Sequence, residues 1–438
     1  MTINSTLSPT IIAREALRLL RNNMVMGGLV YRDYEAEFPG NPKKGGNVTI
    51  RKPVKFTVTK ARTRTTSVIT EHSITLSVST QAHVSWQFEM AQLTLTIEEY
   101  SDRYLRPACA ALANQVDADL CALYKDIYNE VYESSGFVTP HTYTVVGKAM
   151  QRLDEEAAPP DGRVVVLNPA AHWALANTLT TLYQQEPGTK ALRKGFLGRI
   201  ANAEFYMDQN IKVHTFGGWY DTASVTSGMD HVHIGLTGGT GIVTAGGAAA
   251  GAICTSAKSV IMIDYLGGGT AARTECFLPG DTFSISNVFA VNPMSGESTG
   301  TLRQFVITAT VAGLVTGTSS GNAITVSFEP AMVNTGPYKT VSTVAAPNAT
   351  AAIWHVPNGQ TVQNLAFHKD AFALVMVPLE QPKDEWGATM TDEGFSIRIV
   401  KQYSIAGDEE ICRLDILYGV KTLYPELAVR ISGLETTV

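Results

Sequence analysis

A single long apolar stripe, from about Thr96 to Glu133, limits most strongly what this chain can fold into. Apolar residues recur there three or four positions apart, which places them on one side of an α-helix. The stripe consists of Leu105, Ala108, Leu112, Val116, Leu120, Leu123, Ile127 and Val131. Polar residues fill the opposite side, namely Asn114, Gln115, Asp117, Asp119, Lys125, Asp126, Asn129 and Glu130. At roughly 1.5 Å per residue the helix would span on the order of 50 Å, so we expect it to brace an elongated element.

Pro107 interrupts this stripe near its start. Proline lacks the backbone N–H that a helix interior needs, but it is well suited to a first helical turn. We therefore expect either a kink at Pro107 or a short helix over Thr96–Arg106 followed by a fresh helical start.

Two stretches of alternating apolar and polar residues precede the helix, from Val48 to Thr59 and from Ile74 to Glu89. A period of two is typical of β-strands, so we expect two long strands with Ala61–His72 as the tip of a hairpin. A hairpin alone is at best marginally stable in water, so its apolar face needs a surface to lie on. Another subunit is one such surface.

Positive charge is concentrated on this hairpin. Residues 1–66 carry twelve Lys or Arg and four Asp or Glu, a local balance of +8 that leaves −14 on the rest of a chain whose net charge is −6. Exposed aromatic residues do not interleave the cations, so a charge match between subunits is favoured over nucleic acid or a merely solvated face. The predicted inter-subunit contact residues are Lys43, Lys44, Arg51, Lys52, Lys55, Lys60, Arg62, Arg64, Glu98, Glu99 and Asp102.

Helices and strands alternate on either side of these elements. Ser8 and Pro9 open an amphipathic helix that ends near Gly27, and that either packs on its own domain or acts as an arm. After the long helix, Tyr143–Ala157 is predicted as a helix, Arg163–Leu167 as a buried strand, and the residues after Asn168 as another helix. This order is typical of an α+β protein.

Composition changes between Val225 and Ala345, where the chain has ten charged residues but 18 of its 37 glycines. Short β-branched runs are separated there by turn clusters such as Pro279-Gly280-Asp281. We expect an all-β module, a small barrel, inserted in the α+β host. The host resumes around Val362 with further strands.

Chemical motifs are weak. Gly317–Gly321 formally matches the G-x-S-x-G elbow around Ser319, but it lies between two β-runs without the helix that a nucleophile elbow requires. His231 and His233 lack a third ligand nearby, and Gly235–Gly251 matches neither a P-loop nor a dinucleotide fingerprint. We therefore predict no catalytic residue, no cofactor and no metal site.

Cysteine usage and the lack of long apolar stretches indicate the compartment. The five cysteines lack CxxC spacing, which indicates free thiols in a reducing compartment. Met1–Pro9 lacks a basic stretch followed by an apolar run, and no stretch of 18 apolar residues occurs, so secretion and membrane spanning are not expected.

Four stretches carry a family resemblance: Leu7–Ala16, Ala110–Asp117, Asn364–Leu379 and Cys412–Glu426. Together with the order of elements, they resemble the major capsid proteins of tailed bacteriophages, in the branch whose shell fold carries an inserted β-barrel. The resemblance covers nearly the whole chain and is weakest in residues 225–345.

The resemblance implies a domain plan for the tailed-phage capsid fold. It assigns residues 1–38 to an N-terminal arm, 39–92 to an extended hairpin loop, 93–165 to the spine helix and peripheral domain, 166–224 to the first part of the axial domain, 225–345 to the inserted β-barrel, and 346–438 to returning strands of the axial and peripheral domains. The implied function is a structural coat protein that self-assembles, as hexamers and pentamers, into an icosahedral shell around double-stranded DNA.

The same resemblance implies partners: a scaffolding protein, a portal protein and packaged DNA bound without sequence specificity, with no membrane. It also implies a place in the virion after assembly in the host bacterial cytoplasm. Two alternatives from other classes remain open at this point, a serine hydrolase that uses Ser319 and a cytosolic β-rich binding protein.

Overall fold

The structure, a computed structural model, describes residues 9–33, 46–56, 58, 60–64, 69, 71–89, 101–133, 139–182, 199–200, 202–217, 232–235, 242–243, 259–264, 273–313, 323–344, 350–353, 359–382, 386–404 and 409–433. The chain divides into two compact units. Unit 1 contains Met1–Pro53, Glu71–Cys121 and Lys369–Leu423, and unit 2 contains Val54–Thr70, Ala122–His368 and Tyr424–Val438.

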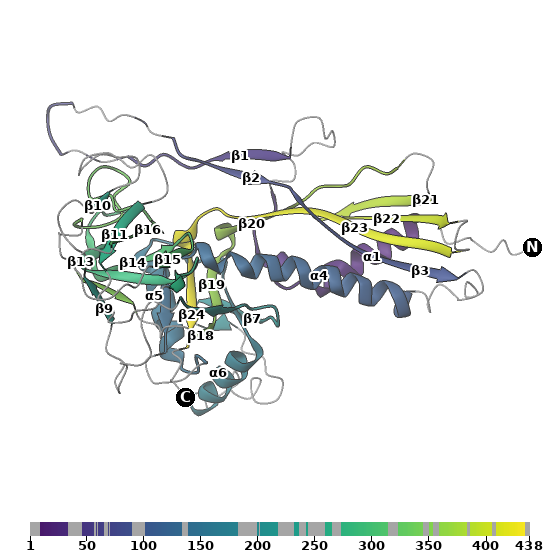
Figure 1. The fold of residues 1–438 in the computed structure, drawn as a ribbon, viewed down its shortest axis with the longest axis horizontal. Helices are drawn as coiled ribbons and strands as arrows, with labels where there is room; N and C mark the ends of the chain where they lie inside the picture. Colours follow the sequence, from purple (N-terminus) through teal and green to yellow (C-terminus); the bar gives the residue numbers. More distant parts are fainter. Residues whose placement is uncertain are drawn as a thin grey trace, which may run out of the picture. The chain divides into compact units, whose positions relative to one another are not determined.

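A five-stranded antiparallel sheet organises unit 1 (Figure 1). Its strands are β3 (Thr80–Glu89), β20 (Phe372–Met376), β21 (Trp386–Asp392), β22 (Phe395–Ser404) and β23 (Glu409–Thr422). The longest strand, β23, pairs with β3, β20 and β22, while β21 pairs with β22. One strand from the first quarter of the chain and four from its last fifth therefore form one sheet.

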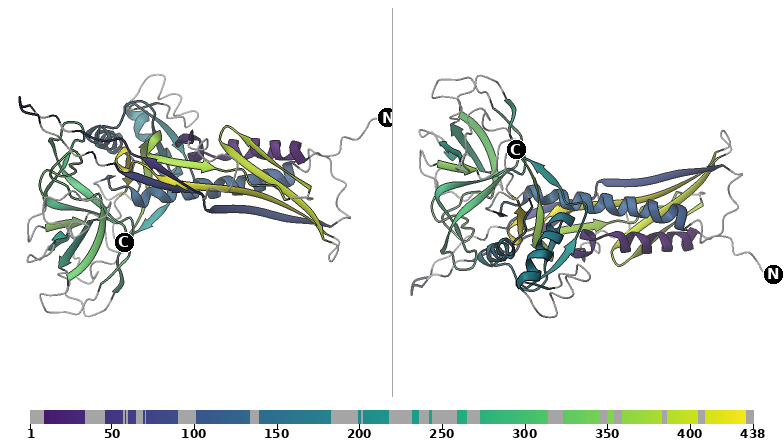
Figure 2. Two further views of the ribbon diagram at one scale, coloured as in Figure 1. Left: turned by 90° about the horizontal axis from the view of Figure 1, so that it is seen from above. Right: turned by 90° about the horizontal axis from the view of Figure 1, so that it is seen from below.

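Two helices pack together against this sheet, α1 (Pro9–Asn23) and α4 (Arg106–Cys121) (Figure 2). Helix α1 begins at Pro9 as predicted and buries Ile12, Ala16 and Leu20 against β21, β22 and α4. Arg21 in its last turn pairs with both Asp392 and Glu393 of the β21–β22 turn. Of the two readings of this helix, packing on its own domain is the one that the structure has.

A buried carboxylate fixes the next short helix, α2 (Met26–Leu29), to α4. Asp117 of α4 accepts hydrogen bonds from the backbone N–H of Val25 at 2.7 Å and of Gly27 at 2.9 Å. The side chain is 1% exposed, so its prediction on the polar, outer side of the helix is wrong. The reason is that the free N–H groups at the start of α2 need an acceptor, and α4 supplies it.

The predicted long helix is shorter than its stripe suggests. Residues 91–100 lie outside the described part of the chain. A π-helical turn (Ser101–Leu105) leads into α4, and a 3₁₀ turn (Ala122–Asp126) follows it. Pro107 is the second residue of α4, and the π-helical turn runs into α4 without a break, so the prediction of a separate helical start at this point is not confirmed. The prediction of helix through Glu133 is wrong, because Glu130–Tyr132 forms strand β4.

The predicted hairpin is regular only at its base. Strand β1 (Asn47–Arg51) pairs with β2 (Ser73–Ser77), and Ile50 and Leu76 are buried there. No described residue from Lys52 to Ile69 belongs to a strand, because Pro53 cannot donate a ladder hydrogen bond. The second predicted strand is in fact two strands, and β3 pairs along its whole length with β23 of the same chain.

A six-stranded mixed sheet forms the host part of unit 2. In spatial order its strands are β4 (Glu130–Tyr132), β24 (Ala428–Ser432), β19 (Asn364–His368), β5 (Arg163–Leu167), β7 (Ala203–Met207) and β6 (Arg199–Ile200). Helices α5 (Tyr143–Glu155) and α6 (Pro169–Leu182) pack on it, with Leu153, Val165 and Phe205 among the buried residues of the shared core. A short pair, β8 (Val213–Thr215) with β18 (Gln360–Val362), joins the same unit. These elements confirm the predicted α+β host.

The inserted region is all-β in its described residues, as predicted. Seven antiparallel strands form one sheet, in spatial order β10 (Ile242–Val243), β11 (Ser259–Asp264), β16 (Ala323–Glu329), β14 (Ser298–Ile307), β13 (Thr282–Val291), β17 (Thr350–Ile353) and β9 (Val232–Gly235). A separate pair joins β12 (Arg273–Phe277) to β15 (Val311–Gly313). The rings of Phe283, Phe305 and Phe328 pack at 5.1 to 5.6 Å in its core.

Candidate functional site

The predicted cationic contact residues fall into two environments. Arg51 ends β1 and lies 3.3 Å from the carboxylate of Glu71, with both side chains more than half exposed. Such a pair contributes little to stability in water. The cations beyond the strand are exposed, except for half-buried Lys52; they are Lys55, Lys60, Arg62 and Arg64.

The predicted acidic partners are not placed by the described residues. Lys43, Lys44, Glu98 and Glu99 lie outside them, and of Asp102 the structure describes the backbone, in the π-helical turn, but not the side chain. The pairing of the cations with these acids therefore stays a prediction.

Apolar side chains accompany the cations at the surface, and the expectation that no exposed aromatic residue lies among the cations is wrong at Phe56. Phe56 is 68% exposed, Val58 90% and Ile69 61%. We call the described residues from Val54 to Ile69 the exposed segment. Burying the side chain of Phe56, or that of Val58, would contribute about 1.5–3 kcal/mol of binding free energy. The exposed segment is therefore suited to bind an apolar surface with negative charges at its rim.

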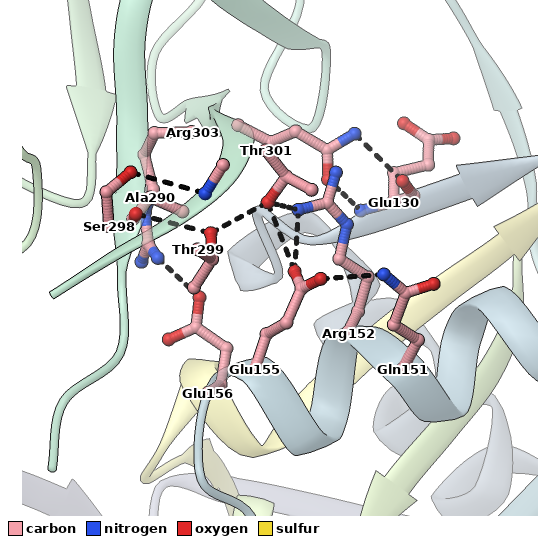
Figure 3. A network of polar contacts seen from close by, with 12 residues as sticks. Glu130, Gln151, Arg152, Glu155, Glu156, Ala290, Ser298, Thr299, Thr301 and Arg303 are labelled. Carbon is pink, nitrogen blue, oxygen red and sulfur yellow. Dashed lines mark hydrogen bonds and ion pairs between the residues drawn. The ribbon is translucent and has the colours of Figure 1, made fainter. Parts of the chain in front are cut away.

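A second polar region lies inside unit 2, and the sequence analysis missed it. It joins the inserted sheet, at the start of β13 and along β14, to the host (Figure 3). We call it the polar seam. Its host residues are Tyr124, Tyr128, Glu130, Arg152, Glu155, Glu156 and His214, and its inserted residues are Asp281, Thr282, Thr301, Arg303 and Gln304.

One end of the polar seam is a buried chain of three side chains. The Tyr124 hydroxyl lies 2.8 Å from Nδ1 of His214, and Nε2 of His214 lies 2.8 Å from the carboxylate of Asp281. The other oxygen of Asp281 accepts backbone N–H bonds from Leu278 at 2.8 Å and Gly217 at 3.2 Å. All three side chains are less than 5% exposed, so this chain of hydrogen bonds lies in the interior and joins β8 to the start of β13.

Glu130 is the hub of the seam. Its carboxylate accepts hydrogen bonds from the hydroxyls of Thr282 and Ser432, and it lies 3.8 Å from the guanidinium of fully buried Arg430. Gln304 bonds both the backbone N–H and the backbone C=O of Glu130 at 2.8 Å. A buried carboxylate is tolerated only when it is paired and hydrogen-bonded, and Glu130 meets that condition.

A buried ion pair forms the next part of the seam. Arg303 of β14 donates to Glu156, which follows α5, and its guanidinium lies 4.4 Å from the ring centre of Tyr128. Burial raises the pKa of the Glu156 carboxyl above its ordinary value, and Arg303 partly offsets this. Burial likewise raises the pKa of the Tyr128 hydroxyl, which therefore stays protonated.

The outer edge of the seam is a half-buried cluster on α5. Arg152 donates to the hydroxyl of Thr301 at 2.7 Å and to Glu155 at 3.2 Å, and Thr301 also donates to Glu155. Figure 3 shows these side chains converging between α5 and β14, with Gln151 bonded to Glu155 from the helix side.

One sequence signal could have found this seam. The inserted region has ten charged residues. A charged residue in an otherwise apolar β-module has a specific partner more often than a charged residue on a highly charged surface does. Asp281 and Arg303 are two of them.

Other chemistry has little support in the described residues. No group of three or more His, Cys, Asp or Glu among them could hold a metal ion. Ser319 and His231 lie outside the described residues, and so does the predicted glycine-rich loop apart from short strand pieces. Cys109, Cys121 and Cys412 are buried free thiols. No described helix is long and apolar enough to span a membrane.

Comparison with known proteins finds a family match over part of the chain. Residues 253–433 match the family described as P22 coat protein, gene protein 5. No curated protein matches the chain.

Several solved structures are similar to this chain. One is titled "Mycobacterium phage Che8" (14% identity, 93% of this chain and 90% of that chain covered, TM-score 0.44). Another is titled "Capsid structure of the Cyanophage P-SCSP1u" (10% identity, 90% and 85% covered, TM-score 0.41). A third is titled "Crystal structure of virus-like particle from Pyrococcus furiosus" (8% identity, 97% and 98% covered, TM-score 0.33).

Proposed function

We propose that this chain is a structural major capsid protein of tailed phages and that its copies join through the exposed segment. Its role is structural and not enzymatic, and its place is the virion. The observation that carries the proposal is the exposure of Phe56, Val58 and Ile69 beside exposed cations.

The apolar side chains supply the area of this contact. Each one would contribute about 1.5–3 kcal/mol when it is covered, reduced by the cost of ordering the segment. A single weak contact is sufficient, because every subunit in a closed shell is held by many of them.

The cations supply the orientation. Lys55, Lys60, Arg62 and Arg64 would face an acidic surface on the neighbouring copy, and Glu98, Glu99 and Asp102 are the candidates for it. Lys43, Lys44, Arg51 and Lys52 would extend the same basic surface. Charged groups at the rim of an interface act mainly on partner choice and association rate, and salt weakens them.

We extend the proposal to the other partners of a head shell. The copies would form hexamers and pentamers with a scaffolding protein and a portal protein, in the host bacterial cytoplasm. Outside residues 1–66 the chain carries −14 net charge, so double-stranded DNA would touch the wall without sticking to it.

The test is assembly of the full chain, with its scaffolding partner present, followed by sedimentation and negative-stain electron microscopy. The first variant is Phe56→Ser with Val58→Ser, and the second is Arg62→Gln with Arg64→Gln. The matched charge control is Lys369→Gln with Lys421→Gln, two exposed lysines outside the exposed segment. We expect the first variant to stop at small oligomers, and the second to need lower salt than the control.

Shells formed equally well by all three variants would contradict the proposed contact while leaving the coat-protein assignment intact. A wild-type chain that stays monomeric with its scaffold would contradict shell formation itself.

A further inference from the structure

A cavity of about 430 Å³ opens beside the polar seam within unit 2. It is lined by α5, β4, β13 and β14, the elements that Figure 3 shows meeting at this point. This volume falls in the range of pockets that bind small molecules, roughly 300–1,000 Å³. Its lining residues are Glu130, Val131, Tyr132, Lys148, Gln151, Arg152, Ser284, Thr301, Leu302 and Gln304.

Three side chains of this lining use their hydrogen-bond acceptors within the protein. The carboxylate of Glu130 is held by Thr282, Ser432 and Arg430, and both ends of the Gln304 amide are used on the backbone of Glu130. The side-chain oxygen of Thr301 is shared with Arg152 and Glu155. A cationic ligand would therefore have to compete with existing bonds at Glu130, Gln304 and Thr301.

Donors remain. Ser284 is 1% exposed, and its hydroxyl has no hydrogen-bond partner among the residues that the structure describes. Lys148 is exposed at the mouth, without an ion pair to any described residue. Lys148 and Arg152 are four residues apart on α5, which places them on one face of the helix. A buried hydroxyl without a partner costs free energy that a bound acceptor would recover.

The remaining wall is apolar. Val131, Leu302 and the ring of Tyr132 contribute it, and burial raises the pKa of the Tyr132 hydroxyl, so this group stays neutral. We propose that the cavity binds a small anion, a carboxylate or a phosphate monoester, carried on a compact apolar group. The anion would lie toward Lys148 and Ser284, and the apolar group against Val131 and Leu302.

The probes are benzoate, phenyl phosphate and inorganic phosphate, titrated into the purified full chain by calorimetry. We expect one of the two aromatic anions to bind at a single site, and the stronger one identifies the head group. Inorganic phosphate should bind more weakly than phenyl phosphate, because it cannot use the apolar wall.

Two variants locate the site. Lys148→Gln should weaken binding by about tenfold, the loss expected for one charge-assisted hydrogen bond, and Ser284→Ala should weaken it by several fold without loss of stability. Lys369→Gln, an exposed lysine in unit 1, is the control and should bind as the wild type does. Absence of binding by both aromatic anions, equal affinity for inorganic and phenyl phosphate, or equal binding by Lys148→Gln and the control would each overturn the proposal.

Discussion

The exposed segment and the polar seam both carry several charges, but the charges of the seam are buried with partners, whereas those of the exposed segment face water. In the seam, Glu130, Glu156 and Asp281 are buried, and each meets a partner from a distant part of the chain. In the exposed segment the cations and the apolar side chains of Phe56 and Val58 face water. The polar groups of the seam find their partners within one chain, whereas we propose that those of the exposed segment find theirs on another molecule.

The largest expected effect tests the seam. Arg303→Met removes the partner of buried Glu156, and it should lower the free energy of unfolding by about 3–5 kcal/mol, because an uncompensated buried carboxylate remains. The measurement is urea denaturation of the full chain. Replacing both partners, Arg303→Met with Glu156→Leu, should restore much of the loss. A double variant as unstable as the single one would mean that shape, and not charge, holds the seam.

A smaller loss is expected at a buried carboxylate outside the seam. Asp117→Ala removes two hydrogen bonds to the backbone at the start of α2, and it should cost about 2–3 kcal/mol. Asp119→Ala, two residues further along α4 at a partly buried site, serves as a comparison within the same helix. Thermal unfolding of unit 1 is the measurement, and an unchanged midpoint for Asp117→Ala would contradict the anchoring role.

The stability of the polar seam should depend on pH through Glu156. Because burial raises the pKa of Glu156 above the ordinary value of 4.5, its protonated form favours the folded chain. The stability from this proton is complete below pH 4.5 and is lost as the pH rises through the folded pKa. Glu156→Gln should lack this part of the pH dependence, as measured by denaturation at several pH values. An identical pH profile for wild type and Glu156→Gln would contradict the raised pKa.

The smallest effect on stability is expected in the exposed segment. Phe56→Ser with Val58→Ser should change the free energy of unfolding of the monomer by less than about 0.5 kcal/mol, since both side chains are mostly exposed. The same holds for Arg51→Gln, whose ion pair with Glu71 is exposed. A large loss of monomer stability in either variant would show that the segment is part of the core.

Regular local patterns were predictable from the sequence. The strand Arg163–Leu167, the helix start at Pro9 and the β-strands among the described residues of 225–345 follow from patterns within a few residues, and the structure confirms them. The end of the long helix was not predictable, because Ile127 and Val131 continue the helical spacing, while pairing with β24 draws Glu130–Tyr132 into a sheet. Tertiary pairing overrides local spacing at that point.

The polar seam could not be predicted from the sequence for a related reason. Glu130 and Asn129 look like the outer face of a helix, and nothing near them in sequence reveals that Thr282 and Gln304 will bond Glu130. The exposed segment was found as a charge pattern, but its apolar residues were assigned to a regular strand. Only the burial values separate Ile50, which is covered, from Val58, which is not.

The pairing of β23 also sets an order of events during synthesis. Residues 80–89 of β3 find their strand partner only at residues 409–418, about 320 positions later. At roughly 5–20 residues per second, a ribosome needs about 16–64 s to deliver that partner. During this time β3 is a newly made strand without its sheet, so a chaperone that shields it should raise the yield of folded protein, whereas unit 2 has most of its own strands as soon as residue 368 has emerged.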